Sequence, residues 1–67
     1  MVHEKLHAYI KQMGIKQGAI ARYIGVTEGL LSQMLTGKTR LTAEVFFAVC
    51  AFLHADPNLF APDKQQD

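Results

Sequence analysis

Apolar residues recur along the chain at spacings of three and four, the period of an amphipathic α-helix, and no segment alternates as a half-buried strand would. Leu6, Ile10 and Met13 form the first apolar stripe, and Gly14 follows it as a C-terminal stop. We therefore expect a first helix of about three turns. The pattern as a whole predicts an all-α fold.

Two shorter apolar stripes follow, and each stops at a glycine. They consist of Ile20, Ala21 and Ile24 before Gly25, and of Leu31, Met34 and Leu35 before Gly37. Thr27 is placed to cap the later helix with its hydroxyl, and Glu28 adds a negative charge to the first turn, where it suits the helix dipole. The pattern predicts two short helices joined by a tight turn.

A fourth segment, from about Ala43 to His54, is apolar around most of its circumference. Thr42 is its expected N-cap, and Leu41 and Phe46 have the spacing of a hydrophobic staple. A helix of this composition needs burial on several sides, so we expect it to be the central helix of the core.

The last apolar residues follow Asp56 and Pro57, an N-cap with proline in the first turn after it. The short turn of helix that begins there is expected to place Leu59 and Phe60 against the core. Residues from about 62 to 67 are polar and are expected to fray. All 67 residues are thus predicted to form one domain of five short helices.

The composition limits the kinds of protein that this chain can be. A length of 67 residues and a hydrophobic fraction of 49% indicate a small folded domain rather than a disordered chain. No apolar run is long enough for a membrane span, and the N-terminal residues lack the apolar core of a signal peptide. Cys50 is the only cysteine, so no intrachain disulfide can form. We expect a cytoplasmic protein that is stabilised by apolar packing, with oligomerisation as a further source of stability.

Residues 17–36 have the spacing of a helix-turn-helix unit. Two helices that cross steeply need a small residue at the crossing, which Ala21 supplies, and the tight turn needs a positive φ, which Gly25 supplies. The apolar contacts that would lock the helices together and onto the core come from Ile20, Ile24, Val26, Leu31 and Met34. The later helix would then be held outward, with its N-terminal half free.

The stretch QGAIARYIGVTEGLLSQMLTGKTRLT resembles the Cro/C1-type (XRE) helix-turn-helix family, which includes lambdoid phage repressors and Cro proteins. The resemblance extends from about Glu4 to Phe60 and implies a compact five-helix, lambda-repressor-like DNA-binding domain. It also implies a function, that of a sequence-specific transcriptional regulator that inserts its third helix into the major groove of double-stranded DNA. Such a regulator would bind a palindromic operator as a homodimer.

The resemblance assigns two groups of DNA contacts to this chain. Base edges would be read by Thr27, Glu28, Gly29, Leu30 and Gln33. Phosphates would be bound by Lys16, Gln17, Lys38, Thr39 and Arg40. Among the readers, Gln33 can pair with an adenine through both edges of its amide, whereas Glu28 can either accept from a cytosine amino group or serve only the helix dipole.

Positive charge is concentrated in the same part of the chain. The net charge of the whole chain is only +1, but the charged side chains between residues 16 and 40 sum to +3. They are Lys16, Arg22, Lys38 and Arg40 against Glu28. A near-neutral protein with one basic region is suited to approach a phosphate backbone.

A competing interpretation comes from the first residues. His3, Glu4 and His7 form the H-E-x-x-H pattern that binds zinc in metalloproteases. The pattern stands at the start of the chain, with no preceding segment to build a cleft. No recognisable third-ligand signature follows it, although Glu28, Glu44 and His54 are available. We therefore interpret it as the exposed face of the first helix, and we expect no enzyme, no metal site and no cofactor.

Two further hypotheses share the same fold. The chain could be an antitoxin or an anti-defence-linked repressor of its own operon, or a helix-turn-helix domain used for contact with a protein such as a toxin or a phage regulator. Glu28, Leu30 and surplus apolar surface motivate the last hypothesis. For the homodimer, contact is expected around residues 57–60 and the exposed side of the fourth helix, with Phe46 or Phe47.

Overall fold

The computed structural model describes residues 1–60, and every regular element in that range is helical. The chain forms four α-helices and one 3-10 turn, which are α1 (Val2–Met13), α2 (Gln17–Ile24), α3 (Glu28–Leu35), α4 (Ala43–Leu53) and η1 (Pro57–Phe60). The expectation of an all-α fold is therefore confirmed. The fraying expected at about 62–67 lies outside the described residues.

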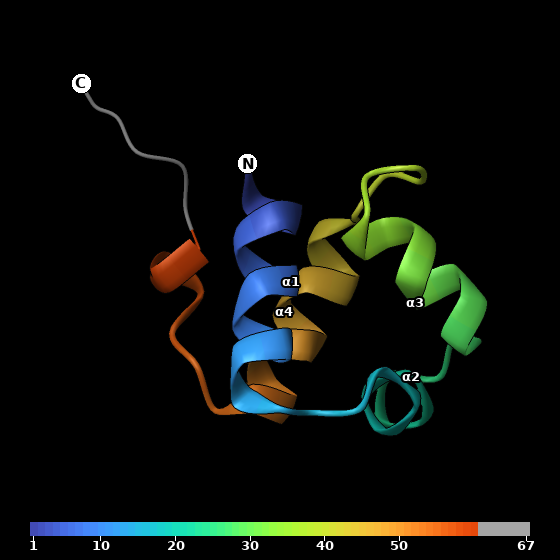
Figure 1. The fold of residues 1–67 in the computed structure, drawn as a ribbon, viewed down its shortest axis with the longest axis horizontal. Coiled ribbons are helices and arrows are strands. Elements are labelled where there is room, and N and C mark those ends of the chain that lie inside the picture. The colour runs from blue at the N-terminus through green and yellow to red at the C-terminus, as the bar shows by residue number, and fades with distance from the viewer. Residues whose placement is uncertain (61–67) are drawn as a thin grey trace.

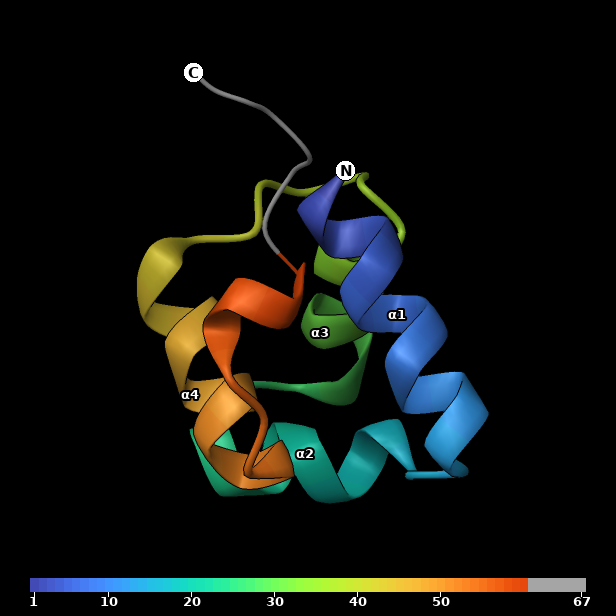
Figure 2. The ribbon, with the colours of Figure 1, turned by 90° about the vertical axis from the view of Figure 1, so that its left-hand side faces the viewer.

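The elements are arranged with α3 at one edge of the molecule and η1 at the opposite edge (Figure 1). η1 packs against both α1 and α4, and α2 runs across one end of the molecule in contact with α3 and α4 (Figure 2). α1 also packs against α3. α3 is therefore supported from the inside by two helices, and its other side lies at the surface.

The prediction of five helices needs one correction, because Pro57–Phe60 forms a 3-10 turn rather than an α-helix. Asp56 caps this turn as expected, since its Oδ1 accepts from Asn58 N at 2.9 Å. The bond from Leu59 N to Asp56 O, also 2.9 Å, spans three residues. A segment this short favours the tighter 3-10 geometry over a run of α-helical bonds.

The helix ends fall at the residues that the sequence singles out. Gly14 and Gly25 adopt left-handed conformations with φ of 70° and 83°, which a side chain would oppose. Thr27 and Thr42 cap α3 and α4, and each hydroxyl accepts from the backbone amide three residues on, at 3.1 and 3.2 Å. Local sequence therefore sets where these helices begin and end.

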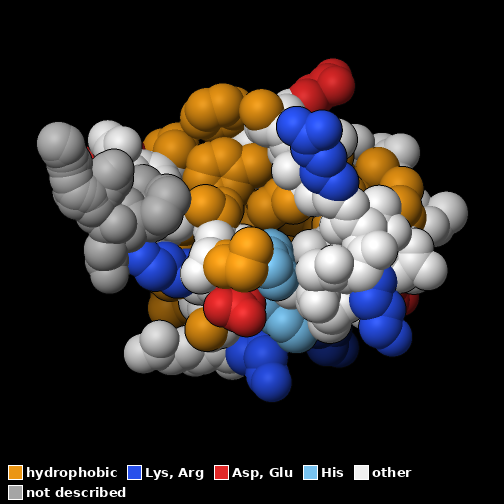
Figure 3. Space-filling view, turned by 90° about the horizontal axis from the view of Figure 1, so that it is seen from above, with side chains coloured by type: hydrophobic (Ala, Val, Ile, Leu, Met, Phe, Trp, Pro, Cys, Tyr) orange, Lys and Arg blue, Asp and Glu red, His pale blue; other side chains and the backbone are white. Residues whose placement is uncertain are grey.

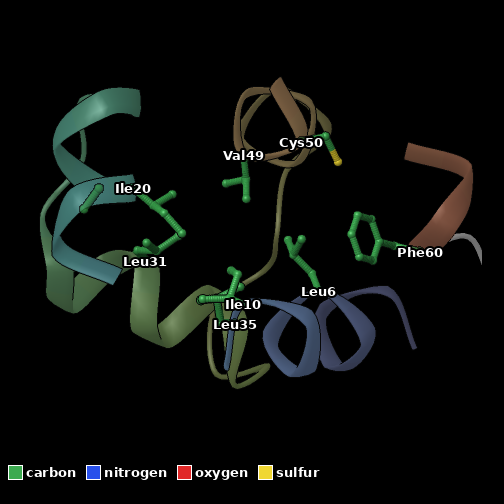
Figure 4. Close-up of a cluster of buried hydrophobic side chains, with 9 residues drawn as sticks. Leu6, Ile10, Ile20, Leu31, Leu35, Val49, Cys50 and Phe60 are labelled. Atoms are coloured by element: carbon green, nitrogen blue, oxygen red, sulfur yellow. The ribbon is translucent and has the colours of Figure 1, made fainter. Parts of the chain in front are cut away.

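The core lies where the four α-helices and η1 meet (Figure 4). Each α-helix contributes two buried side chains to it and η1 contributes one, the set being Leu6, Ile10, Ile20, Ala21, Leu31, Leu35, Val49, Cys50 and Phe60. Burying a large aliphatic side chain contributes about 1.5–3 kcal/mol. The apolar stripes predicted from the sequence thus form one shared core.

Met13, expected in the first apolar stripe, is instead 57% exposed. α1 ends at this residue, and the chain turns back through Gly14. Ile15 N then bonds to Ile10 O at 3.1 Å, and the Ile15 side chain packs on the core. A hydrophobic contact of this kind accompanies many helix ends. Helical periodicity does not predict it, because the residue that makes it lies after the helix has ended.

Leu59, expected against the core, is 58% exposed, whereas Phe60 is buried. The Phe60 ring lies edge-on to the rings of Tyr9 and Phe46, with centroids 5.3 and 6.2 Å apart. Adjacent side chains in a single helical turn point in different directions, so only one of the two can face inward. The Leu59 side chain is therefore left on the surface.

α4 is less enclosed than its composition suggests. Val49 and Cys50 are buried, but Phe47 is 56% exposed, because α2 and η1 cover only part of the helix. Burial raises the pKa of the Cys50 thiol, and the nearby Asp56 carboxylate raises it further, so this thiol stays protonated at neutral pH. No helix within residues 1–60 has the length and apolar character needed to cross a membrane.

His54 ends α4 in a left-handed conformation, with φ of 55° and ψ of 37°. This conformation costs a residue with a Cβ about 1–2 kcal/mol, and glycine avoids most of that cost. We predict that His54→Gly raises the free energy of unfolding by about 0.5–1 kcal/mol, because the relief of this strain exceeds the stability lost to glycine's greater freedom in the unfolded chain. Chemical denaturation of the two proteins measures the difference.

His54→Ala is the matched control, because it removes the imidazole and keeps the Cβ. It should leave the domain no more stable than the unmodified chain. Equal stabilisation by both substitutions would show that the imidazole, and not the backbone conformation, is unfavourable at this position.

Candidate nucleic-acid interface

α2 and α3 are joined by a tight turn that starts at Gly25. Gly25 N and Val26 N both bond to Ala21 O, at 2.9 and 3.0 Å, and the buried Ala21 lies beneath the turn. The other residues expected to lock this unit face inward, with Ile20, Leu31 and Met34 buried and Ile24 and Val26 half-buried. The turn and the core together hold α3 with one side outward.

The five residues expected to read bases lie together at the exposed side of α3 and its N-terminus. They are Thr27, Glu28, Gly29, Leu30 and Gln33, and all are exposed. Apart from its chain neighbours and the backbone of α3, no heavy atom lies within 4 Å of the position that a Cβ on Gly29 would take, so this position is open to a close approach. Leu30 is 38% exposed and gives this surface an apolar part.

Glu28 reaches back from α3 to the start of α2. Its carboxylate lies against Gly18, where an added Cβ would be 3.4 Å from Oε1. α2 has no side-chain cap and no acidic residue in its first turn, so this carboxylate supplies the negative charge that a helix N-terminus favours. Lys16 and Arg22 line a surface pocket together with Gly18 and Glu28. The placement matches a role in helix stabilisation, with Glu28 in the first turn of α3 and its carboxylate beside the start of α2.

The side chain of Gln17 is held by α1. Its Nε2 donates to Nε2 of His7 across 3.3 Å, in a partly buried hydrogen bond between the two helices. The imidazole accepts in this bond only in the neutral tautomer that leaves Nε2 without a proton. The side chain expected to meet a phosphate is thus engaged within the protein.

The loop after α3 folds back onto Gln33. Lys38 N and Thr39 N both bond to the Gln33 carbonyl, at 2.9 and 3.1 Å. The Thr39 hydroxyl donates to Oε1 of the Gln33 side chain at 3.1 Å. Thr39 was expected to bind a phosphate, yet here it is half-buried and bound to an expected base reader. This link could not be predicted from the sequence, because residues six apart in a helix and a loop share no periodic pattern.

Four cationic side chains lie on the elements that precede and follow α3. Lys16 is the N-cap of α2, Arg22 lies in its last turn, and Lys38 and Arg40 belong to the loop after α3. All four are exposed. Exposed cations can track a phosphate backbone without first losing contacts in the protein interior.

The two histidines of the H-E-x-x-H pattern contact other parts of the protein. His3 and His7 are half-buried, which corrects the expectation of a solvated face. An added Cβ on Gly37 would lie 2.7 Å from His3 Nε2, so this ring packs against the loop after α3, while His7 bonds to Gln17. Within residues 1–60 no three His, Cys, Asp or Glu side chains converge on a position for a metal ion.

An apolar hollow of about 740 Å³ lies beside the same loop, between the N-terminus of α1 and the start of α4. Figure 3 shows hydrophobic side chains gathered around it. Leu41 and Phe46, the expected hydrophobic staple, both line the hollow, and Arg40 lies at it too. Apolar surface therefore adjoins the expected phosphate contacts.

Comparison with protein families matches residues 6–60 to the family described as Helix-turn-helix. Neither the curated proteins nor the solved structures contain a match. The family match covers most of the chain, from within α1 to the end of η1. It confirms the resemblance seen in the sequence, and the chain belongs to the Cro/C1-type (XRE) helix-turn-helix family of DNA-binding regulatory domains.

Proposed function

We propose that this domain is a sequence-specific transcriptional regulator that binds a palindromic operator as a homodimer. The observation that carries the proposal is the exposed side of α3, where the expected base readers stand between the cations of α2 and those of the following loop. In this mode α3 enters the major groove and α2 lies across the DNA backbone. The shape and charge of the surface match both parts of such a contact.

Base reading is assigned mainly to Gln33, whose amide can pair with both N6 and N7 of an adenine. Leu30 offers an apolar contact to a thymine methyl, and Gly29 lets the helix backbone approach the groove. The Thr27 hydroxyl accepts from Leu30 N, and its O–H and its methyl group remain available to a base. Each of these contacts lies within the first two turns of α3.

Phosphate binding is assigned to the exposed Lys16, Lys38 and Arg40. Because the Gln17 side chain is bound to His7, the contact at the start of α2 falls to the backbone amides of its first turn. Contacts of this type fix the register of a protein on DNA and depend strongly on salt.

Dimerisation is assigned to the exposed apolar residues of α4 and η1. Phe47 is 56% exposed and Leu59 is 58% exposed. The ring of Phe46 connects the two elements. Its centroid lies 5.4 Å from that of the Phe47 ring and 6.2 Å from that of the Phe60 ring. One small domain reads few base pairs, so two half-sites about one helical turn apart are needed for selectivity.

Selection of bound duplexes from a random DNA pool tests the proposal. Enrichment of one sequence with two related half-sites supports it, and failure to enrich any sequence contradicts it. A phage-type or Cro-like repressor, an antitoxin and an anti-defence-linked autorepressor would all pass this test, because they share the binding mode and differ in the genes they control.

Contact with a protein is the second candidate function, and the apolar hollow beside Arg40 is the observation that favours it. A toxin or a phage regulator could bind there through an apolar side chain. Duplex binding that weakens as salt rises separates the first function from the second.

The DNA-binding mode predicts different effects for a phosphate contact and a base contact. Arg40→Ala should weaken binding to operator and scrambled duplexes alike and should lower the slope of log K against log salt by about one unit. Gln33→Ala should cost about 1–3 kcal/mol on the operator and much less on scrambled DNA. Titrations of both variants at several salt concentrations measure these effects. Equal losses on both duplexes for Gln33→Ala would contradict its role as a reader.

The position of Glu28 beside the start of α2 predicts an effect on every duplex. Glu28→Gln removes a negative charge from the place where a phosphate would approach, so binding should tighten by about two- to fivefold on operator and scrambled DNA. Asp56→Asn is the matched control, since it removes the same charge just before η1, on the side opposite α3, and keeps an oxygen that can accept from Asn58 N. It should change binding to scrambled DNA less. Loss of preference at one base pair would show that Glu28 reads cytosine.

The proposed dimer contact predicts that polar substitutions at two surface positions produce monomers. Phe47→Ser combined with Leu59→Ser should lower the solution mass at micromolar concentration to that of one chain and should weaken the operator complex. Met13→Ser is the control, because Met13 is equally exposed, at 57%, but lies at the end of α1 rather than on α4 or η1. Sedimentation measures the mass. An unmodified chain that is monomeric and protects one half-site would overturn the assignment.

A further inference from the structure

We infer that Thr39 is a positioning residue for base reading, which holds the amide of Gln33 in place for an adenine. The inference rests on the proposed function, since it concerns how the reader on α3 is presented to DNA. It gives Thr39 a different role from the phosphate contact that the family resemblance implies.

Two hydrogen bonds join this pair of residues. Thr39 N bonds to the Gln33 carbonyl at 3.1 Å, and the Thr39 hydroxyl donates to Gln33 Oε1 at 3.1 Å. One bond fixes the backbone of the loop against the end of α3, and the other fixes the side chain that extends from it. Because both bonds come from one residue, movement of the side-chain amide is coupled to the position of the loop.

The neighbouring bonds keep the hydroxyl in its place. Lys38 N also bonds to the Gln33 carbonyl at 2.9 Å, and the Thr36 hydroxyl bonds to Ser32 O at 2.9 Å and to Gln33 O at 3.4 Å. The loop is therefore anchored to the last turn of α3 at several points. Because this loop is anchored, Thr39 can restrict the Gln33 side chain. A mobile loop would move together with that side chain and would not restrict it.

The chemistry of the amide leaves its base-reading groups available. An amide oxygen has two lone pairs, and the hydroxyl of Thr39 uses one of them. The second lone pair and both N–H groups remain to accept from N6 and donate to N7 of adenine. A free glutamine loses much rotamer freedom when it binds, so holding the amide beforehand reduces that loss.

Thr39 should therefore affect preference among bases rather than general affinity for DNA. Its hydroxyl is neutral and is directed at the reader, so its removal should leave the salt dependence of binding unchanged. A net contribution typical of one hydrogen bond corresponds to a change of about three- to tenfold.

The test compares conservative substitutions on the sequence that selection enriches. Thr39→Val keeps the shape and removes the hydroxyl, Thr39→Ser keeps the hydroxyl, and Thr36→Val is the matched control that removes a loop hydroxyl bonded only to backbone carbonyls. Neither threonine is buried, so the variants should fold. Binding is measured on the operator and on duplexes changed at the base pair whose preference Gln33→Ala abolishes.

Thr39→Val should reduce the preference at that base pair by about three- to tenfold with an unchanged salt slope. Thr39→Ser should retain the preference, and so should Thr36→Val. An unchanged preference in Thr39→Val would overturn the inference. A salt slope lowered by about one unit would overturn it as well, because it would make Thr39 a phosphate contact.

A measurement without DNA separates failure of the inference from failure of the proposed function. Nuclear magnetic resonance relaxation of the Gln33 side-chain amide should show a restricted group in the unmodified chain and in Thr39→Ser, and a more mobile one in Thr39→Val. Equal mobility in all three would overturn the inference. A restricted amide in a protein that enriches no duplex would instead overturn the proposed function, and the reading role of Thr39 with it.

Discussion

Burial of one apolar side of α3 controls how this domain presents its surface. Leu31, Met34 and Leu35 are buried against the other helices. In a chain of 67 residues each such side chain supplies a large share of the total stability, so α3 cannot rotate without losing much of it. The burial that stabilises the domain therefore also decides which residues of α3 face solvent.

Hydrogen bonds and charge then define the outward surface in more detail. Gln33 is bound by the following loop at both its carbonyl and its amide, and Glu28 lies against the first turn of α2. These long polar side chains are thus partly ordered before any partner arrives. A surface prepared in this way loses less conformational entropy on binding than one made of free side chains.

α1 links the core to this surface. Leu6 and Ile10 face the core, while His3 and His7 contact the loop after α3 and the start of α2. Residues four apart share one face of a helix. The spacing that would present two imidazoles to a zinc ion therefore presents them here to two neighbouring segments of the same protein.

The helices, their ends and the family could be predicted from the amino-acid sequence, because caps such as Thr27 and turns such as Gly25 depend on residues within one helical turn. It also indicated which stripes enter the core. Three features became visible in the fold alone: Leu59 stays on the surface, the Glu28 carboxylate lies beside α2, and Thr39 binds Gln33. These features depend on how the helices and the loop pack against one another in space. The spacing of residues along the chain does not show which side chains of different elements come into contact.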